Sequence, residues 1–477
     1  MSNPVRFAIV VVVWAAIYLP GLGSLEIKGE EGRRILPAVT MLETANFIVP
    51  YVGSDPYFTK PPLVNWLVAA SFKLFGTRNE WTARLPSALC ILIVALAFLT
   101  IARRTLGENG SVVAGLAWLA NFGMIEKGRL IEIEALYTSL SGLAFICWFA
   151  WYLQKRSAWL TWTVPWLFLG LGWLAKGPLH LVFFYAVIGA VLYYRREFRR
   201  LFQPAHLAGI LLMVAIFAAW AVPCLMMTTH DANVTHIWSR QFSGRVSGES
   251  FHFRSWIMNI PRGLAYFLPW LLVFPFAGRV EFADEEERRT VRGLGWGIAG
   301  SFVAINLLPG SLPRYTMPLL VPACRLLAMI VCAERFDLRP LLNVSKPVAL
   351  PPALRLPVTI ATVISVAMLI YGFAVVPQLK HREKVRTIAA QIDAAIPARE
   401  PLYTVDPDYQ PFLFYVHAPI RYLRTVSEIP NEARFVLVQP QNRDALAESE
   451  KWLPRRARPI LPVKDYRERE TTLFQIE

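Results

Sequence analysis

The sequence predicts a polytopic α-helical membrane protein with a small soluble α/β domain at its C-terminus. Of its 477 residues, 55% are hydrophobic and only 17% are charged, whereas soluble domains carry about 25% charged residues. The apolar residues form long runs without amphipathic spacing, which is typical of membrane spans. After about residue 376 the pattern changes to short apolar segments separated by polar residues.

About eleven apolar runs are candidates for membrane-spanning helices, several of them near the lower length limit of roughly 17 residues. No signal-peptidase site follows the first run, so we interpret Met1–Pro20 as an uncleaved helix. The candidate spans are 6–22, 86–102, 111–125, 133–153, 159–175, 178–194, 206–226, 263–280, 293–309, 314–333 and 354–376.

The charges between these runs predict the orientation of the chain. Clusters of arginine and lysine fall in every second connector, as they do in cytoplasmic connectors of inner-membrane proteins. The N-terminus is therefore expected in the cytoplasm, and everything after residue 376 on the periplasmic side. The clusters are Arg103-Arg104, Lys155-Arg156, Arg195-Arg196, Arg288-Arg289, and Arg335 with Arg339.

This topology divides the chain into a transmembrane part, 1–376, and a periplasmic α/β domain, 377–477. The transmembrane part has long outer loops at about 23–85 and 227–262, which we expect to form short amphipathic helices on the membrane surface. We expect the C-terminal domain to be a separable fold. Its predicted helix is Val385–Ile396, and its predicted strands are Leu402–Val405, Phe412–Val416 and Arg434–Val438.

The net charge of +15 is explained by the cytoplasmic clusters, so the sequence does not point to nucleic acid as a partner. All five cysteines lie within or at the end of apolar runs, and no CxxC motif occurs. We therefore predict no disulfide, no metal site and no cofactor.

The outer connectors carry residues that could take part in chemistry. Glu30 and Glu31 follow the first span, where a carboxylate can accept a proton, although a solvated interfacial cluster is equally compatible with the composition. Lys60 precedes two prolines and is suited either to binding a phosphate or to capping a turn. Glu134 ends the run Glu126–Glu134, which is either functional or a charged connector.

Several cations lie on the outer side, where the positive-inside rule does not require them. A charge close to the hydrocarbon region is costly and usually has a partner or a function. A membrane-anchored phosphate would be such a partner, whereas any single cation could also extend from a helix end into water. We therefore predict an anion site formed by Arg84, Lys176, Arg245 and Arg314 together with Lys60, with Tyr57 and Tyr315 as substrate contacts.

These residues lie in motifs that resemble GT-C membrane glycosyltransferases of the aminoarabinose-transferase and protein O-mannosyltransferase type. The resemblance covers about 20–335. In the first loop it is carried by Glu30-Glu31-Gly32-Arg33, Val49-Pro50, Tyr57-Phe58-Thr59-Lys60-Pro61-Pro62, Phe75-Gly76 and Ala83-Arg84-Leu85-Pro86-Ser87-Ala88, and later by Lys176-Gly177-Pro178 and Arg314-Tyr315-Thr316-Met317-Pro318.

The resemblance implies transfer of a sugar, with inversion, from a polyprenyl-phosphate carrier in the outer leaflet to a lipid A, glycolipid, glycan or protein acceptor. The family usually has Asp-Glu where this chain has Glu30-Glu31, an aspartate where it has Glu134, and often a tyrosine where it has Arg34. The base is therefore one of three glutamates, Glu30, Glu31 or Glu134. We prefer Glu30 and expect Glu31 to pair with a nearby arginine such as Arg34.

Two other classes of function compete with this interpretation. A secondary transporter would show paired, broken spans in two halves with charges near mid-membrane, whereas the charges here gather at one face. A non-catalytic membrane scaffold would not require Glu30, Lys60 or Glu134. Loss of sugar transfer after substitution of Lys60, with normal membrane insertion, would separate the enzyme from both alternatives.

Overall fold

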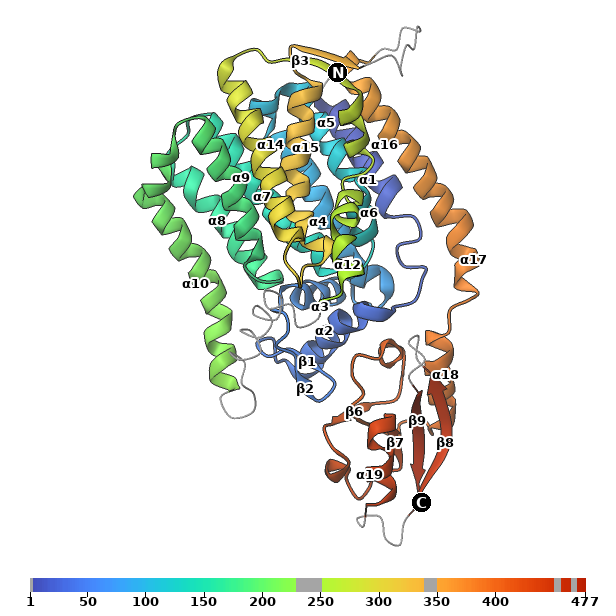
Figure 1. Cartoon of the computed structure of the whole chain (residues 1–477). Coiled ribbons are helices and arrows are strands. Elements are labelled where there is room, and N and C mark those ends of the chain that lie inside the picture. The colour runs from blue at the N-terminus through green and yellow to red at the C-terminus, as the bar shows by residue number, and fades with distance from the viewer. Residues whose placement is uncertain (1–2, 229–250, 339–349, 450–455, 465–469) are drawn as a thin grey trace. The chain divides into compact units, whose positions relative to one another are not determined.

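The structure, a computed structural model, describes residues 3–228, 251–338, 350–449, 456–464 and 470–477. Its internal contacts divide the chain into two compact units that alternate along the sequence (Figure 1). The helical unit comprises 1–20, 59–63 and 85–372, and the mixed unit comprises 21–58, 64–84 and 373–477.

Long apolar helices form the helical unit. One of them, α4, begins in the mixed unit and continues into the helical unit. Each lies within or close to a predicted apolar run. The helices are α1 (Asn3–Tyr18), α4 (Glu80–Thr100), α5 (Arg103–Leu119), α7 (Ile133–Leu153), α8 (Ala158–Ala175), α9 (Leu179–Tyr194), α10 (Pro204–Met227), α14 (Glu285–Asn306), α15 (Leu320–Val331) and α16 (Pro352–Ile370).

Helix α7 is the centre of the helical unit. All residues of its apolar stretch are buried, and it packs against α8 and α15. In Figure 1, α8, α9 and α10 lie on one side of α7, and α1, α5 and α16 lie on the other. A Cβ added at Gly142 of α7 would lie 2.4 Å from Val321 Cγ2 of α15, so only glycine allows the two helices to approach this closely.

Six stretches of the described residues are long and apolar enough to cross a membrane, judged by length and composition. The fold is thus that of a multi-pass membrane protein, and its described residues contain fewer full-length apolar helices than the eleven runs suggested. The shorter apolar helices include α1 and α9. The six stretches are Glu80–Thr100, Ile133–Leu153, Ala158–Ala175, Pro204–Met227, Pro313–Val331 and Pro352–Ala395.

The predicted span at 263–280 is wrong, because this run does not form one helix. It is divided among α13 (Asn259–Ala265), a 3₁₀ segment η3 (Trp270–Phe276) and β3 (Ala277–Glu281). Pro269 and Pro275 lack the N–H group that a helix needs at these positions, so the run is apolar without being helical. Strand β3 pairs antiparallel with β4 (Arg335–Leu338) instead.

The mixed unit contains most of the first outer loop and the tail. The loop forms a short 3₁₀ turn η1 (Gly29–Glu31), α2 (Gly32–Thr44), a hairpin of β1 (Tyr51–Val52) and β2 (Asp55–Pro56), and most of α3 (Leu63–Phe75). The tail begins with α17 (Val376–Lys380) and α18 (Val385–Ala395). The contacts therefore group the tail with the first loop, whereas we had expected it to be a separable fold.

A five-stranded mixed sheet organises the tail, in the order β6-β5-β7-β9-β8. The three strands β6, β5 and β7 are parallel, and β9 pairs antiparallel with both β7 and β8. The predicted strand Phe412–Val416 is wrong, because Pro411–Phe414 forms a 3₁₀ turn, η6. The strands are β5 (Leu402–Val405), β6 (Ile420–Leu423), β7 (Phe435–Val438), β8 (Ala457–Lys464) and β9 (Glu470–Ile476).

Candidate functional site

Glu134 lies at the centre of a charged cluster in the helical unit. It sits in the first turn of α7 and its side chain is only 6% exposed. Its Oε1 is 3.2 Å from Lys176 Nζ and 3.1 Å from Arg314 Nε. The three residues come from α7, the turn between α8 and α9, and the 3₁₀ turn η4 (Pro313–Leu319). One carboxylate faces two cations, so these three side chains together keep a positive charge.

Two tyrosine rings hold Lys176 in place. Its Nζ lies 5.1 Å from the ring centroid of Tyr137 and 4.9 Å from that of Tyr315. Both tyrosines are buried, and both distances are within the range of a cation–π contact. The backbone also favours this site, because Lys176 is the C-cap residue that follows α8, and the next residue is Gly177, whose φ of +133° suits glycine. The ammonium group is therefore oriented by three neighbours.

A second acidic residue in this connector, Glu132, was not among the predicted site residues. Lys127 Nζ lies 3.6 Å from its Oε1 and 2.9 Å from Oε1 of Glu126. Burial and the nearby charge of Glu134 raise the pKa of Glu132 above its usual range. The sequence signal was its position two residues before Glu134. Of the two glutamates, Glu132 is the one that can more readily take up a proton.

Lys60 and Tyr57 lie in the first outer loop. Lys60 belongs to the segment 59–63 of the helical unit and is half-buried. Tyr57 belongs to the mixed unit, where its hydroxyl accepts a hydrogen bond of 2.8 Å from Nη1 of the buried Arg34. Arg245 lies outside the described residues.

Arg84 is fully committed to the protein, which changes the role that we had predicted for it. Its side chain is 2% exposed. Nε and Nη2 donate to the two carboxylate oxygens of Glu31, each at 2.8 Å. Nη1 donates to the carbonyls of Leu22 and Leu25, and Nη2 also donates to that of Glu26. All five N–H groups of Arg84 are thus occupied, and none remains for a phosphate.

Glu30 and Glu31 differ in their surroundings although they are neighbours. Glu31 is buried and pairs with Arg84, not with Arg34 as we had expected. The side chain of Glu30 is 40% exposed, and its Oε2 is 3.2 Å from Arg33 Nη1. Glu30 is therefore the more accessible of the two carboxylates, and Glu31 has a structural role.

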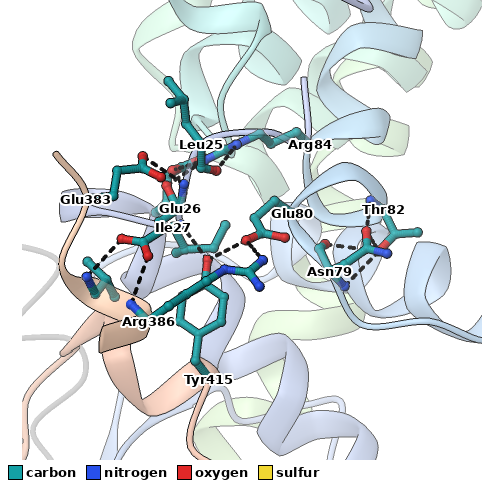
Figure 2. Close-up of polar contacts among 12 residues, drawn as sticks. Leu25, Glu26, Ile27, Asn79, Glu80, Thr82, Arg84, Glu383, Arg386 and Tyr415 are labelled. Atoms are coloured by element: carbon teal, nitrogen blue, oxygen red, sulfur yellow. Dashed lines mark hydrogen bonds and ion pairs between the residues drawn. The ribbon is translucent and has the colours of Figure 1, made fainter. Parts of the chain in front are cut away.

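Two further buried carboxylates join the first loop to the tail within the mixed unit. Glu26 accepts hydrogen bonds of 2.8 and 2.9 Å from the backbone N–H groups of Val385 and Arg386, at the start of α18. Glu80 accepts a hydrogen bond of 2.8 Å from the hydroxyl of Tyr415 and pairs with Arg386. Figure 2 shows these side chains turned toward one another beside Arg84. Sequence reasoning missed both glutamates, because their partners are distant in the chain.

Comparison with known proteins shows which sequences and structures this chain resembles. The sequence model of the family "Dolichyl-phosphate-mannose-protein mannosyltransferase" matches residues 59–222. The structure is similar to that of ArnT from Cupriavidus metallidurans in the apo state, with a TM-score of 0.69, 19% identity, and coverage of 99% of this chain and 97% of that one. The chain has an ArnT-like fold. The expected resemblance is confirmed.

Curated relatives support the same resemblance. An undecaprenyl phosphate-alpha-4-amino-4-deoxy-L-arabinose arabinosyl transferase of Proteus mirabilis is 26% identical over 310 residues, which cover 63% of this chain and 55% of the relative. A transferase of the same name from Pseudomonas paraeruginosa is 24% identical over 338 residues, or 69% of this chain and 60% of the relative. The matches thus span little more than half the length of these relatives.

The buried pair of Glu31 and Arg84 predicts a large loss of stability when only one partner is removed. Glu31→Ala leaves the buried guanidinium without its counter-charge, which should cost about 3–5 kcal/mol. Thermal unfolding of the detergent-solubilised protein would measure the loss. Glu43→Ala is the matched control, because the pair of Glu43 and Arg78 is half exposed and should contribute less than about 1 kcal/mol. Equal effects of the two substitutions would contradict the structural role of Glu31.

Proposed function

We propose that the chain is an inverting glycosyltransferase that uses a sugar linked to a polyprenyl phosphate of the undecaprenyl type. The observation that carries this proposal is the cluster of Glu134, Lys176 and Arg314, in which two cations share one carboxylate. The excess positive charge suits an anionic phosphate. The fold supports the proposal, since an ArnT of the same fold, 18% identical to this chain, has been solved bound to undecaprenyl phosphate.

In the proposed mechanism the donor phosphate binds to Lys60, Lys176 and Arg314, and Arg245 is a further candidate. Glu30 accepts the proton of an acceptor hydroxyl or amine, whose oxygen or nitrogen then attacks the anomeric carbon with inversion. The bond between this carbon and the phosphate oxygen breaks, and the polyprenyl phosphate leaves with its charge stabilised by the cations. Little general-acid assistance is needed, because the leaving group is already anionic. Tyr57 and Tyr315 are proposed as substrate contacts.

We propose that the enzyme lies in the bacterial inner membrane. In this arrangement the N-terminus is cytoplasmic, and the outer connectors and the tail are periplasmic, as the positions of the arginine clusters indicate. The tail sheet would then be a soluble domain outside the membrane. The names of the relatives favour 4-amino-4-deoxy-L-arabinose as the sugar, and the acceptor is lipid A, another glycolipid, a glycan or a protein.

Transfer by the purified protein in proteoliposomes tests this proposal. Undecaprenyl-phosphate-linked aminoarabinose and lipid A are supplied together, and the product is identified by mass spectrometry. Lipids and glycoproteins from a deletion strain identify the acceptor if lipid A is not modified. Movement of a labelled donor across the bilayer without any transfer would favour the transporter instead.

Substitution of Lys60 tests the donor site. Lys60→Ala should weaken donor binding by about 1.5–3 kcal/mol, because a phosphate loses a charge-assisted contact. The apparent affinity for the undecaprenyl-linked donor is the quantity to measure. Lys73→Ala is the control, since Lys73 is exposed on α3 of the same loop and should leave donor affinity unchanged. If Lys60→Ala also leaves it unchanged, Lys60 only supports the turn before Pro61.

Substitution of Glu30 tests the assignment of the base. Glu30→Gln keeps the size of the side chain but removes its basicity, so the rate of transfer should fall by about 10²–10⁴-fold. Binding of the carrier and thermal stability should persist, because Glu30 is partly exposed. Rates for Glu132→Gln and Glu134→Gln are measured in parallel. A normal rate for Glu30→Gln together with inactivity of either other variant would move the base to the connector before α7.

A further inference from the structure

We infer that Tyr409 in the tail is a positioning residue for Glu30 and acts through Arg33. The inference rests on the proposed function, in which Glu30 accepts the acceptor proton. It assigns to the tail a part in positioning the base, since Tyr409 lies in the tail, between β5 and η6. All contacts that support it lie within the mixed unit.

The first observation is a continuous set of contacts from Tyr409 to Glu30. The guanidinium carbon of Arg33 lies 3.9 Å from the centroid of the Tyr409 ring, well within the distance of a cation–π contact. Nη1 of the same guanidinium is 3.2 Å from Glu30 Oε2. Tyr409 is 3% exposed, whereas the side chain of Glu30 is 40% exposed. A ring fixed inside the protein thus supports an arginine that orients a solvent-accessible carboxylate.

The second observation is that the backbone of Tyr409 lies directly against the start of α2. A Cβ added at Gly32 would be 2.4 Å from the carbonyl oxygen of Tyr409 and 3.6 Å from Pro411 Cγ. Gly32 has φ of −53°, an ordinary helical value, so glycine is required here for space and not for conformation. The tail therefore contacts the residue that lies between Glu31 and Arg33.

The third observation is that the tail segment after Tyr409 is fixed to the same loop. The hydroxyl of Tyr415 accepts a hydrogen bond of 2.7 Å from the backbone N–H of Ile27 and donates one of 2.8 Å to Glu80. Ile27 lies two residues before the start of η1, so the contact of Tyr415 with Ile27 and the contacts of Tyr409 with Gly32 and Arg33 lie on either side of Glu30 in the sequence. Two hydrogen bonds therefore hold the tail segment that follows Tyr409 against the first loop.

The test compares three substitutions in the tail of the full-length protein. Tyr409→Leu removes the aromatic face and should lower kcat by about 2- to 30-fold, the rate equivalent of a cation–π contact, with KM for the donor unchanged. Tyr409→Phe keeps the face and should restore kcat. Tyr403→Leu is the matched control, because Tyr403 is buried in the core of the tail sheet and should lower thermal stability while leaving kcat unchanged.

A double substitution separates positioning from a general loss of structure. If Tyr409 acts through Arg33, then Tyr409→Leu should have no further effect on kcat in the Arg33→Ala protein. If Tyr409→Leu lowers kcat by the same factor in the wild-type protein and in the Arg33→Ala protein, the inference is overturned. Equal losses of kcat in Tyr409→Leu and Tyr403→Leu would also overturn it, since the tail would then act only through its stability.

A measurement without donor keeps this inference separate from the proposed function. Carboxyl groups of the wild-type protein are labelled with a water-soluble carbodiimide and an amine, and modification of Glu30 is followed by mass spectrometry. Release of Arg33 in Tyr409→Leu should increase the labelling of Glu30, whereas Tyr409→Phe should match the wild type. Unchanged labelling in Tyr409→Leu overturns the positioning role. Absence of sugar transfer by the wild type, with the labelling shift present, instead overturns the proposed function alone.

Discussion

The guanidinium of Arg84 determines the conformation of the first loop. A buried charge must be compensated, and Arg84 meets this requirement with both oxygens of Glu31 and three backbone carbonyls from residues 22–26. These acceptors belong to two segments, residues 22–26 and the turn that contains Glu31. Both segments must fit around the planar guanidinium of Arg84, which fixes their arrangement. The side chain of Glu26, in the same stretch, accepts hydrogen bonds from the first two backbone N–H groups of α18. One buried cation thus orders the loop, and the ordered loop provides the site at which the tail helix begins.

Two pairs of glutamates divide their roles in the same way. In each pair one carboxylate is buried against cations, namely Glu31 against Arg84 and Glu134 against Lys176 and Arg314. The other member, Glu30 or Glu132, lies further from its arginine or lysine: Glu30 is 3.2 Å from Arg33 and Glu132 is 3.6 Å from Lys127. A buried ion pair contributes little net stability but fixes geometry, since breaking it is costly. The paired carboxylate therefore holds the local structure, and its neighbour is better placed to exchange a proton.

The helices of the core could be predicted from the sequence because a span requires a run of apolar residues whatever its neighbours are. The same reasoning failed at 263–280, where hydropathy is high but Pro269 and Pro275 interrupt the helix. It failed again at Phe412–Val416, since a short continuous run of apolar residues occurs in the 3₁₀ turn η6 as well as in a strand. Local pattern predicts local structure only where the backbone can form its hydrogen bonds.

The charged residues of the site could be named from the sequence, but most of their partners could not. Cations on the outer side pointed to Lys176 and Arg314 individually, whereas their shared carboxylate depends on the packing of α7 against η4 and α8. Glu31 was assigned to an arginine nearby in sequence, yet its partner is Arg84 at the start of α4. Several arginines could pair with a given glutamate. Which of them does so depends on the tertiary fold, because the fold determines which arginine is buried next to the carboxylate.

Arg34 departs from the pattern of the family that the chain resembles, and its contacts give it a structural role. Arg34, where the family often has tyrosine, is buried, and it donates a hydrogen bond to the hydroxyl of Tyr57, whose ring lies 5.8 Å from its guanidinium carbon. Asn65 in turn donates to the backbone carbonyl of Arg34 at 2.8 Å. Arg34 therefore joins the start of α2 to the segment before Lys60. Because Arg34 is committed to Tyr57, the neighbouring Arg33 is the arginine that remains to pair with Glu30. The ring of Tyr409 then orients Glu30 through Arg33. Glu30 has a longer side chain than the aspartate that is usual in the family.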